Sequence, residues 1–199
     1  MDAMDINTII AQRVRELRDA QDLSLEALAK LSGVSRSNIS LIERGESSPT
    51  AALLNKLAAG LGVALASLFE PAQPPAGEPS PLSRRAEQAE WTDPASGYRR
   101  RNLSPAARSP LQLVEVEFPA GQRVAYDGLA REVDIYQQVW IIAGVMELSV
   151  GDQQWRLETG DCLAMRLDQP IVYHNPGSTA ARYLVALAPQ PFSPNRRPA

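Results

Sequence analysis

The sequence contains very few of the residues that most often build metal and disulfide sites. Among its 199 residues there is one histidine, His174, and one cysteine, Cys162. A single cysteine cannot form a disulfide within the chain, so nothing indicates an oxidising compartment. A single histidine excludes histidine-rich metal sites and every catalytic arrangement that needs two histidines. Beside a Gly-Asp turn in an apolar strand, Cys162 is expected to be a buried, inert thiol.

Long apolar runs are also absent. No run approaches the roughly 20 residues that span a bilayer, and the N-terminus MDAMDINTII lacks the basic stretch and apolar core of a signal peptide. We therefore expect a cytoplasmic protein that does not enter a membrane. Apolar residues make up 44% and charged residues 22% of the chain, which excludes a wholly disordered protein.

An excess of positive charge is lacking as well. The net charge is −3, and residues 1–70 contain seven Lys/Arg and nine Asp/Glu. This balance argues against binding nucleic acid through bulk charge. A local basic face remains compatible with it, because reading a DNA sequence needs only a few well-placed cations.

Proline divides the chain. Residues 6–69 contain one proline, whereas residues 71–81 contain five, and a proline-rich stretch of this kind is an extended linker that builds no core. We therefore expect a first domain at 6–70, a linker at 71–89, a second domain at 90–189 and a flexible tail at 190–199.

The two expected domains have different periodicities. In the first, apolar residues recur every three to four positions, and Ser24, Ser35 and Thr50 stand where helix N-caps are expected. Five short helices follow from this pattern, the last over residues 64–69, and they must pack as one bundle. The second domain has short alternating strands broken by turn residues, such as 111–118, which favours a barrel or sandwich.

The strongest signal is residues 24–50, SLEALAKLSGVSRSNISLIERGESSPT. It has Gly33 at the turn, Ala29 at the expected helix crossing, and Pro49 before the fourth helix. It resembles the helix-turn-helix of the Cro/C1-type (XRE) repressor family over about residues 9–69. The resemblance implies a homodimer whose second motif helix enters the major groove of a double-stranded, pseudo-palindromic operator.

Side chains at the start of that second helix are suited to reading bases. Arg36 can contact the O6 and N7 of guanine, and Leu41 can touch a thymine methyl. Ser24 and Arg44 are candidates for phosphate contacts. The alternative for each single residue is an ordinary solvated helix position. The full set of DNA-binding candidates is Ser24, Ser35, Arg36, Ser37, Asn38, Ser40, Leu41 and Arg44. By resemblance, Arg18 and Glu43 form a structural ion pair, so both are excluded from the set.

Residues 111–188 resemble a small cupin barrel, a common partner of this helix-turn-helix. The likeness lies in the turns, at Gly144, at Gly160-Asp161 and at residues 175–177. The expected fold is thus multidomain: an all-α five-helix bundle followed by an all-β cupin barrel of the double-stranded β-helix (jelly-roll) type.

The metal ligands of that family are missing. A cupin usually supplies two histidines and a glutamate from its first motif and a third histidine from its second. The matching positions here are Arg131, Val133, Gln137 and Ile171. His174 is three residues out of phase and is expected on the opposite face. Since valine and isoleucine offer no lone pair to a metal, we expect no metal, no cofactor and no enzymatic activity.

A barrel without metal can still hold a ligand in its mouth. An arginine with two tyrosines and an amide would suit a small carboxylate-bearing effector. The alternative is a fully packed barrel without a pocket. The candidate effector-binding residues are Tyr126, Arg131, Gln137, Arg166 and Tyr173.

The leading hypothesis is a DNA-binding transcriptional regulator whose barrel senses a small effector and pairs two copies of the chain. Two alternatives remain open. A metal-dependent cupin enzyme carrying a DNA-binding domain would contain stoichiometric metal. A DNA-binding dimer with a purely structural barrel would show no change of melting temperature with any small molecule.

Overall fold

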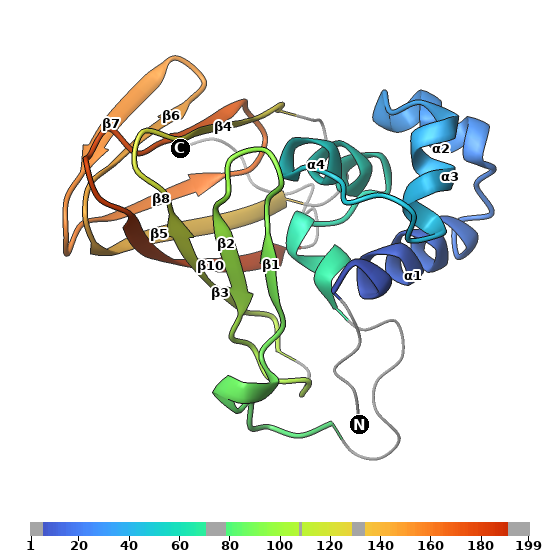
Figure 1. The fold of residues 1–199 in the computed structure, drawn as a ribbon, viewed down its shortest axis with the longest axis horizontal. Helices are drawn as coiled ribbons and strands as arrows, with labels where there is room; N and C mark the ends of the chain where they lie inside the picture. The colour runs from blue at the N-terminus through green and yellow to red at the C-terminus, as the bar shows by residue number, and fades with distance from the viewer. Residues whose placement is uncertain (1–5, 71–78, 108, 129–133, 191–199) are drawn as a thin grey trace, which may run out of the picture.

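A computed structural model describes residues 6–70, 79–107, 109–128 and 134–190. Four α-helices lie at its N-terminal end, and almost everything that follows is β-sheet (Figure 1). The predicted order of a helical domain before a β domain is therefore confirmed. Within the described ranges, no helix has the length and apolar character needed to cross a membrane.

The helices begin at the predicted caps. The side chains of Ser24, Ser35 and Thr50 each accept a hydrogen bond from a backbone N–H in the first helical turn, which satisfies a donor that has no partner within the helix. Gly33 closes the second helix with φ +68°, a conformation that glycine adopts without strain. The helices are α1 (Ile6–Asp19), α2 (Leu25–Ser32), α3 (Arg36–Glu43) and α4 (Ala51–Gly60).

The expected fifth helix is a 3₁₀ helix, η1 (Leu65–Phe69). Its backbone closes through an i→i+3 bond from Ser67 N to Ala64 O. A segment this short favours the tighter 3₁₀ turn, and the burial of Leu68 and Phe69 holds it in place. The fifth helix is therefore present, as a 3₁₀ helix and not as an α-helix.

The β domain consists of two antiparallel sheets, with orders β1-β2-β3-β10-β5-β8 and β4-β9-β6-β7. A second 3₁₀ helix, η2 (Arg85–Glu87), precedes them. The strands are β1 (Glu90–Thr92), β2 (Arg99–Asn102), β3 (Gln112–Phe118), β4 (Arg123–Tyr126), β5 (Asp134–Ala143), β6 (Met146–Val150), β7 (Gln153–Leu157), β8 (Cys162–Arg166), β9 (Ile171–His174) and β10 (Ala181–Gln190).

Alternation along the strands decides which side chains face the space between the sheets. In β3, Val114, Val116 and Phe118 are buried, as the sequence pattern predicts. In β8, Met165 is buried while Cys162 is exposed. The expectation that Cys162 is buried was therefore wrong, because its strand turns that position to the outer face.

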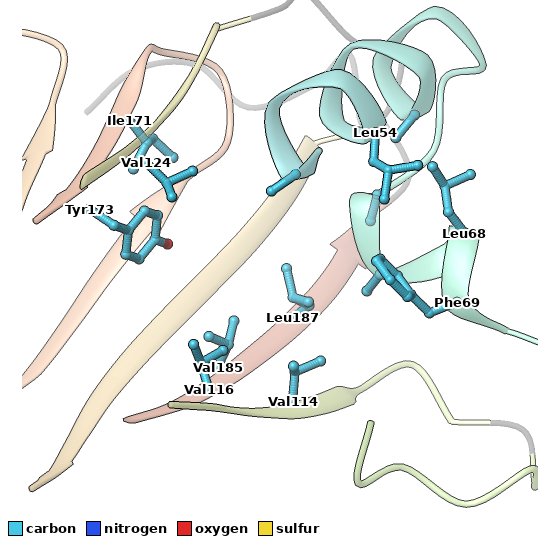
Figure 2. Close-up of a cluster of buried hydrophobic side chains, with 14 of the residues drawn as sticks. Leu54, Leu68, Phe69, Val114, Val116, Val124, Ile171, Tyr173, Val185 and Leu187 are labelled. Carbon is cyan, nitrogen blue, oxygen red and sulfur yellow. The ribbon is translucent and has the colours of Figure 1, made fainter. Parts of the chain in front are cut away.

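The helical domain packs directly on the sheets, and a single buried cluster includes residues of both (Figure 2). Phe69 of η1 meets Trp91 of β1 edge to face, with ring centroids 5.3 Å apart. Asp93 accepts a hydrogen bond from the backbone N–H of Ala51, at the start of α4, over 2.9 Å. The core is therefore continuous across the predicted domain boundary. Residues 71–78 of the predicted linker and 191–199 of the predicted tail lie outside the described residues.

Candidate nucleic-acid interface and interdomain cavity

The helix-turn-helix is held by its apolar residues. Leu28 of α2 and Ile39 and Ile42 of α3 are fully buried, so α3 can present only its opposite side to solvent. Ser35 caps α3 by accepting from Asn38 N over 3.3 Å, and its hydroxyl lies 3.2 Å from that of Ser37. The start of α3 is thereby fixed in orientation while its side chains remain outside the core.

The predicted DNA contacts differ in accessibility. Arg36, Ser37 and Asn38 are exposed in the first turn of α3, as are the two capping serines. Ser40 and Leu41 are half-buried. Exposed cationic and hydroxyl groups at a helix N-terminus are what recognition of base edges and phosphates requires. The assignment of individual contacts stays a prediction.

Arg44, a predicted phosphate contact, already has an anionic partner. Its Nε and Nη2 atoms each lie 2.8 Å from a carboxylate oxygen of Glu46, and Nη1 donates to Ser40 Oγ over 2.5 Å. The hydrogen bonds to Glu46 raise the pKa of Arg44, and the same bonds lower the pKa of the Glu46 carboxyl. A phosphate that binds Arg44 must therefore compete with Glu46 for the guanidinium.

Arg18 and Glu43 lie against each other in the position that the resemblance implies. The guanidinium forms two parallel hydrogen bonds to the carboxylate, of 2.7 and 2.9 Å, and a third to Leu23 O of 2.9 Å. Asp19 is a second anionic neighbour at 2.6 Å. The hydrogen bonds that Arg18 donates to Glu43 raise the pKa of Arg18. The geometry ties α1 to the last turn of α3.

A cavity of about 90 Å³ lies between the two sheets and the helical domain. Figure 2 shows apolar walls on both sides of it, with Tyr173 and Ile171 from one sheet and Val116, Val185 and Leu187 from the other. The helical domain closes it with Asn55, Leu65 and Ala66. Because a buried water needs only about 10–15 Å³ of such space, the cavity has room for several waters or a small ligand.

Three of the predicted effector-binding residues meet in this cavity: Tyr126, Gln137 and Tyr173. Gln137 Nε2 donates to the hydroxyl of Tyr173 over 2.5 Å, and the hydroxyls of Tyr126 and Tyr98 are 3.0 Å apart. Burial raises the pKa of all three tyrosines and of Tyr183 beside them. The cavity is therefore lined with neutral hydroxyls that can donate or accept.

The other two predicted effector residues are not part of this arrangement. Arg131 lies outside the described residues. The expectation that Arg166 points inward was wrong: it is exposed, forms an ion pair with Asp168, and lines a separate hollow on the outer face of the six-stranded sheet. The reason is strand alternation, since its neighbour Met165 is the residue of β8 that points inward.

The sequence analysis missed Arg100 of β2, which is the cation that lines the cavity among the residues that the structure describes. It is 7% exposed, and its guanidinium carbon lies 3.9 Å from the centroid of the Phe69 ring. Burial lowers the pKa of Arg100. The run RRRN at residues 99–102 reads as a solvated charge cluster. Strand alternation places Arg100 on the face opposite to Arg99 and Arg101 but does not say which face is buried.

The residues at the family's metal positions do not fit a metal. Gln137 is engaged with Tyr173, and Ile171 has no donor atom; Arg131 and Val133 lie outside the described residues. His174 points away from the cavity, with Nδ1 3.0 Å from Glu147 Oε2. Over residues 6–70, 79–107, 109–128 and 134–190, no three His, Cys, Asp or Glu side chains cluster as a metal site.

Comparison with known proteins agrees with the helical geometry. The family model of HTH_3, helix-turn-helix, matches residues 14–68. Control protein C.SmaI of Serratia marcescens is 40% identical over 66 residues, which cover 33% of this chain and 79% of that protein. HTH-type transcriptional regulator SutR of Escherichia coli (strain K12) is 25% identical over 175 residues, covering 87% of this chain and 91% of that protein.

The likeness extends to the arrangement of the two domains. The crystal structure of an HTH_3 family transcriptional regulator from Vibrio cholerae superposes with a TM-score of 0.71 at 27% identity, covering 92% of this chain and 96% of that chain. The described helices supply the motif, and similarity to transcriptional regulators runs along most of the chain. The chain therefore belongs to the HTH_3 helix-turn-helix family of DNA-binding transcriptional regulators.

Proposed function

We propose that the protein is a homodimeric, sequence-specific regulator in which a cupin-type barrel binds a small effector and does not catalyse a reaction. The observation that carries the proposal is the exposed first turn of α3, capped by Ser35 and anchored by the buried Ile39. This turn offers Arg36 to the major groove, where a guanidinium can form two hydrogen bonds to guanine. A regulator of this kind acts where the DNA is, which fits the expected cytoplasmic location.

The barrel's role rests on the cavity. Its wall combines apolar side chains with a few hydroxyl and amide groups, which is the usual composition of a small-molecule site. Because Leu65 and Ala66 of the helical domain form part of that wall, a bound ligand would contact the DNA-binding domain directly. Such coupling typically changes affinity by about 1–3 kcal/mol.

Dimerisation is supported by the outer face of the six-stranded sheet. Trp140 and Tyr136 of β5 and Leu111 before β3 are exposed there, with Trp140 47% accessible. Large apolar side chains gathered on one face are typical of a protein interface. A dimer that binds two half-sites must present its two recognition helices to successive major grooves, roughly 34 Å apart. The variant Trp140→Glu should therefore sediment as a monomer.

The two alternatives make different predictions. The metal-dependent enzyme is disfavoured because Ile171 and Gln137 stand at expected ligand positions. Stoichiometric iron, manganese or zinc in the purified protein would revive it. The purely structural barrel is disfavoured by the polar groups that line the cavity, and ligand-dependent stabilisation would exclude it.

The DNA-binding proposal is tested by selecting bound sequences from a random double-stranded pool with the full-length chain. We expect a pseudo-palindromic site whose half-sites are about one helical turn apart. The exposed Arg156 of β7 lies outside the helical domain, so Arg156→Ala should select the same site. Recovery of unrelated sequences without symmetry would contradict sequence-specific recognition by a dimer.

A further inference from the structure

Three consecutive arginines on β2 have different environments. Arg99 and Arg101 point away from the cavity, and each pairs with a glutamate of β3: Arg99 with Glu117 at 2.6 Å, and Arg101 with Glu115. Arg100 points inward and is almost fully buried. Within the part of the chain that the structure describes, no carboxylate lies within ion-pair distance of its guanidinium.

The acidic groups nearest to the cavity are already engaged. Asp127, on the cavity wall, lies 3.3 Å from Lys56 Nζ. Asp93 accepts from Ala51 N and from the N–H and hydroxyl of Ser96. Neither carboxylate is placed to compensate the buried charge of Arg100. A buried cation without an anionic partner is strongly unfavourable, so this position calls for a physical reason.

The surroundings of Arg100 complete an anion site. The Phe69 ring faces one side of the guanidinium at 3.9 Å, an interaction that favours the cation and leaves its edge N–H groups available. Tyr98, Tyr126 and Tyr183 line the same cavity, and burial raises the pKa of each. Because the hydroxyls of Tyr98 and Tyr126 share one hydrogen bond, one of that pair and the hydroxyl of Tyr183 can donate to an anion. The opposite walls, which include Val116 and Leu187, are apolar.

We propose that Arg100 is the anchor for the carboxylate of a compact, largely apolar carboxylic acid, and that Phe69 transmits its binding to the helical domain. The proposal rests on the proposed function, since it names the effector class and the route of regulation at that site. The planar guanidinium of Arg100 can donate two parallel hydrogen bonds to a single carboxylate.

The route of regulation follows from the chain position of Phe69. It is the last residue of η1, and Leu65 and Ala66 of the same segment line the cavity. A carboxylate on Arg100 neutralises the cation that the Phe69 ring faces, while the body of the ligand packs against Leu65. Binding therefore changes the contact between η1 and the barrel, and with it the orientation of α3 relative to a partner copy.

The direct test measures binding of four probes to the full-length protein by calorimetry: benzoate and hexanoate, each beside its neutral amide, benzamide and hexanamide. At least one carboxylate should bind, and its amide should bind about ten- to a hundredfold more weakly. Equal affinity for an acid and its amide, or failure of both acids to bind, overturns the role of Arg100.

Two variants of β2 locate the effect. Arg100→Met should remove the preference for carboxylate over amide, whereas Arg99→Met, on the same strand but outward-facing, should keep it. Arg100→Lys retains the positive charge and should keep a reduced preference for carboxylate over amide. This variant is the control for a folding defect in Arg100→Met. Carboxylate preference in a folded Arg100→Met protein overturns the proposal.

The regulatory step is tested on the DNA site obtained by selection. The binding carboxylate should change the dissociation constant for that DNA, and Phe69→Leu should abolish this change while the carboxylate still binds. An unaltered effect in Phe69→Leu overturns the transmission step. DNA binding by the wild-type protein without any ligand is measured in parallel. If the protein does not bind DNA, the proposed function itself is contradicted. If it binds DNA but does not recognise a carboxylate, only this inference is contradicted.

Discussion

The guanidinium of Arg18 and the carboxylate of Glu43 are joined by two parallel hydrogen bonds, although the residues are 25 positions apart in the chain. Their side chains are only 13% and 8% exposed. The pair connects the last turn of α1 to the end of the helix that we expect in the major groove. We expect the pair to fix the orientation of α3 relative to α1, while other residues contact the bases.

Arg18→Ala should lower the free energy of unfolding by about 3 kcal/mol, because it leaves the Glu43 carboxylate buried without its partner. Urea denaturation measures the change. Arg15→Ala is the control, because Arg15 is 67% exposed and its ion pair with Asp19 is a long one, at 3.7 Å. This variant should change the free energy of unfolding by about 0.5 kcal/mol at most. In the double variant with Glu43→Ala the losses should be less than additive. Unchanged stability in Arg18→Ala would show that the pair is not structural.

Arg36→Ala should weaken binding to the selected DNA site by about 1–3 kcal/mol and relax the preference at one base pair in each half-site. The reason is that two hydrogen bonds to one base disappear while the helix remains capped by Ser35. Competition assays with single-base variants of the site measure both effects. Equal weakening on every DNA sequence would instead make Arg36 a backbone contact.

Glu46→Gln should strengthen DNA binding on all sequences, because the carboxylate that holds Arg44 is replaced by a neutral amide. The freed guanidinium can then bind phosphate, so the dependence of log K on log salt should steepen by about one unit. Glu158→Gln removes a carboxylate that likewise faces an arginine, Arg156, but at the end of β7, and should leave both quantities unchanged. A slope identical to that of the wild type would exclude Arg44 from phosphate binding.

A comparison of Gly144→Ala with Gly160→Ala separates two contributions to the loss of stability, backbone strain at positive φ and steric contact of the new Cβ. Both glycines have positive φ, +85° and +99°. A Cβ at residue 144 would lie 2.9 Å from the Cα of Ala181, whereas one at residue 160 meets nothing within 4 Å. Gly160→Ala should cost about 1–2 kcal/mol of stability, and Gly144→Ala about 1–3 kcal/mol more. Equal melting temperatures for the two variants would contradict close packing at the β5–β10 junction.

Stability should fall steeply with rising pH above about pH 10. Burial raises the pKa of Tyr98, Tyr126, Tyr173 and Tyr183 in the folded protein, while an unfolded tyrosine titrates near pH 10. Above that pH the unfolded chain binds fewer protons than the folded chain, so each buried tyrosine lowers stability by about 1.4 kcal/mol per pH unit. Denaturation between pH 8 and pH 11 measures the slope, and Tyr183→Phe should make it shallower. A flat profile would show that these hydroxyls reach solvent.

Much of the helical domain could be predicted from the sequence because its signals are local. Caps at Ser24, Ser35 and Thr50, the turn at Gly33 and the helical spacing of apolar residues each act within a few positions of the chain. The side chains that line the cavity were predicted less well. Tyr126, Gln137 and Tyr173 were found, Arg166 was assigned to the wrong face, and Arg100 was missed, because the short strand carrying it looks like a solvated run of charge.

The sequence by itself determined the order of a helical and a β domain and the motif that assigns the chain to a family of DNA-binding regulators, since both depend on contacts close along the chain. Only the tertiary structure decided that η1 and β2 meet, so that Phe69 faces Arg100 across the predicted domain boundary. Which arginine of β2 is buried depends on the pairing of that strand with β3 and on the helical domain packed over it. Long-range packing, which no local pattern encodes, places the cation in the cavity.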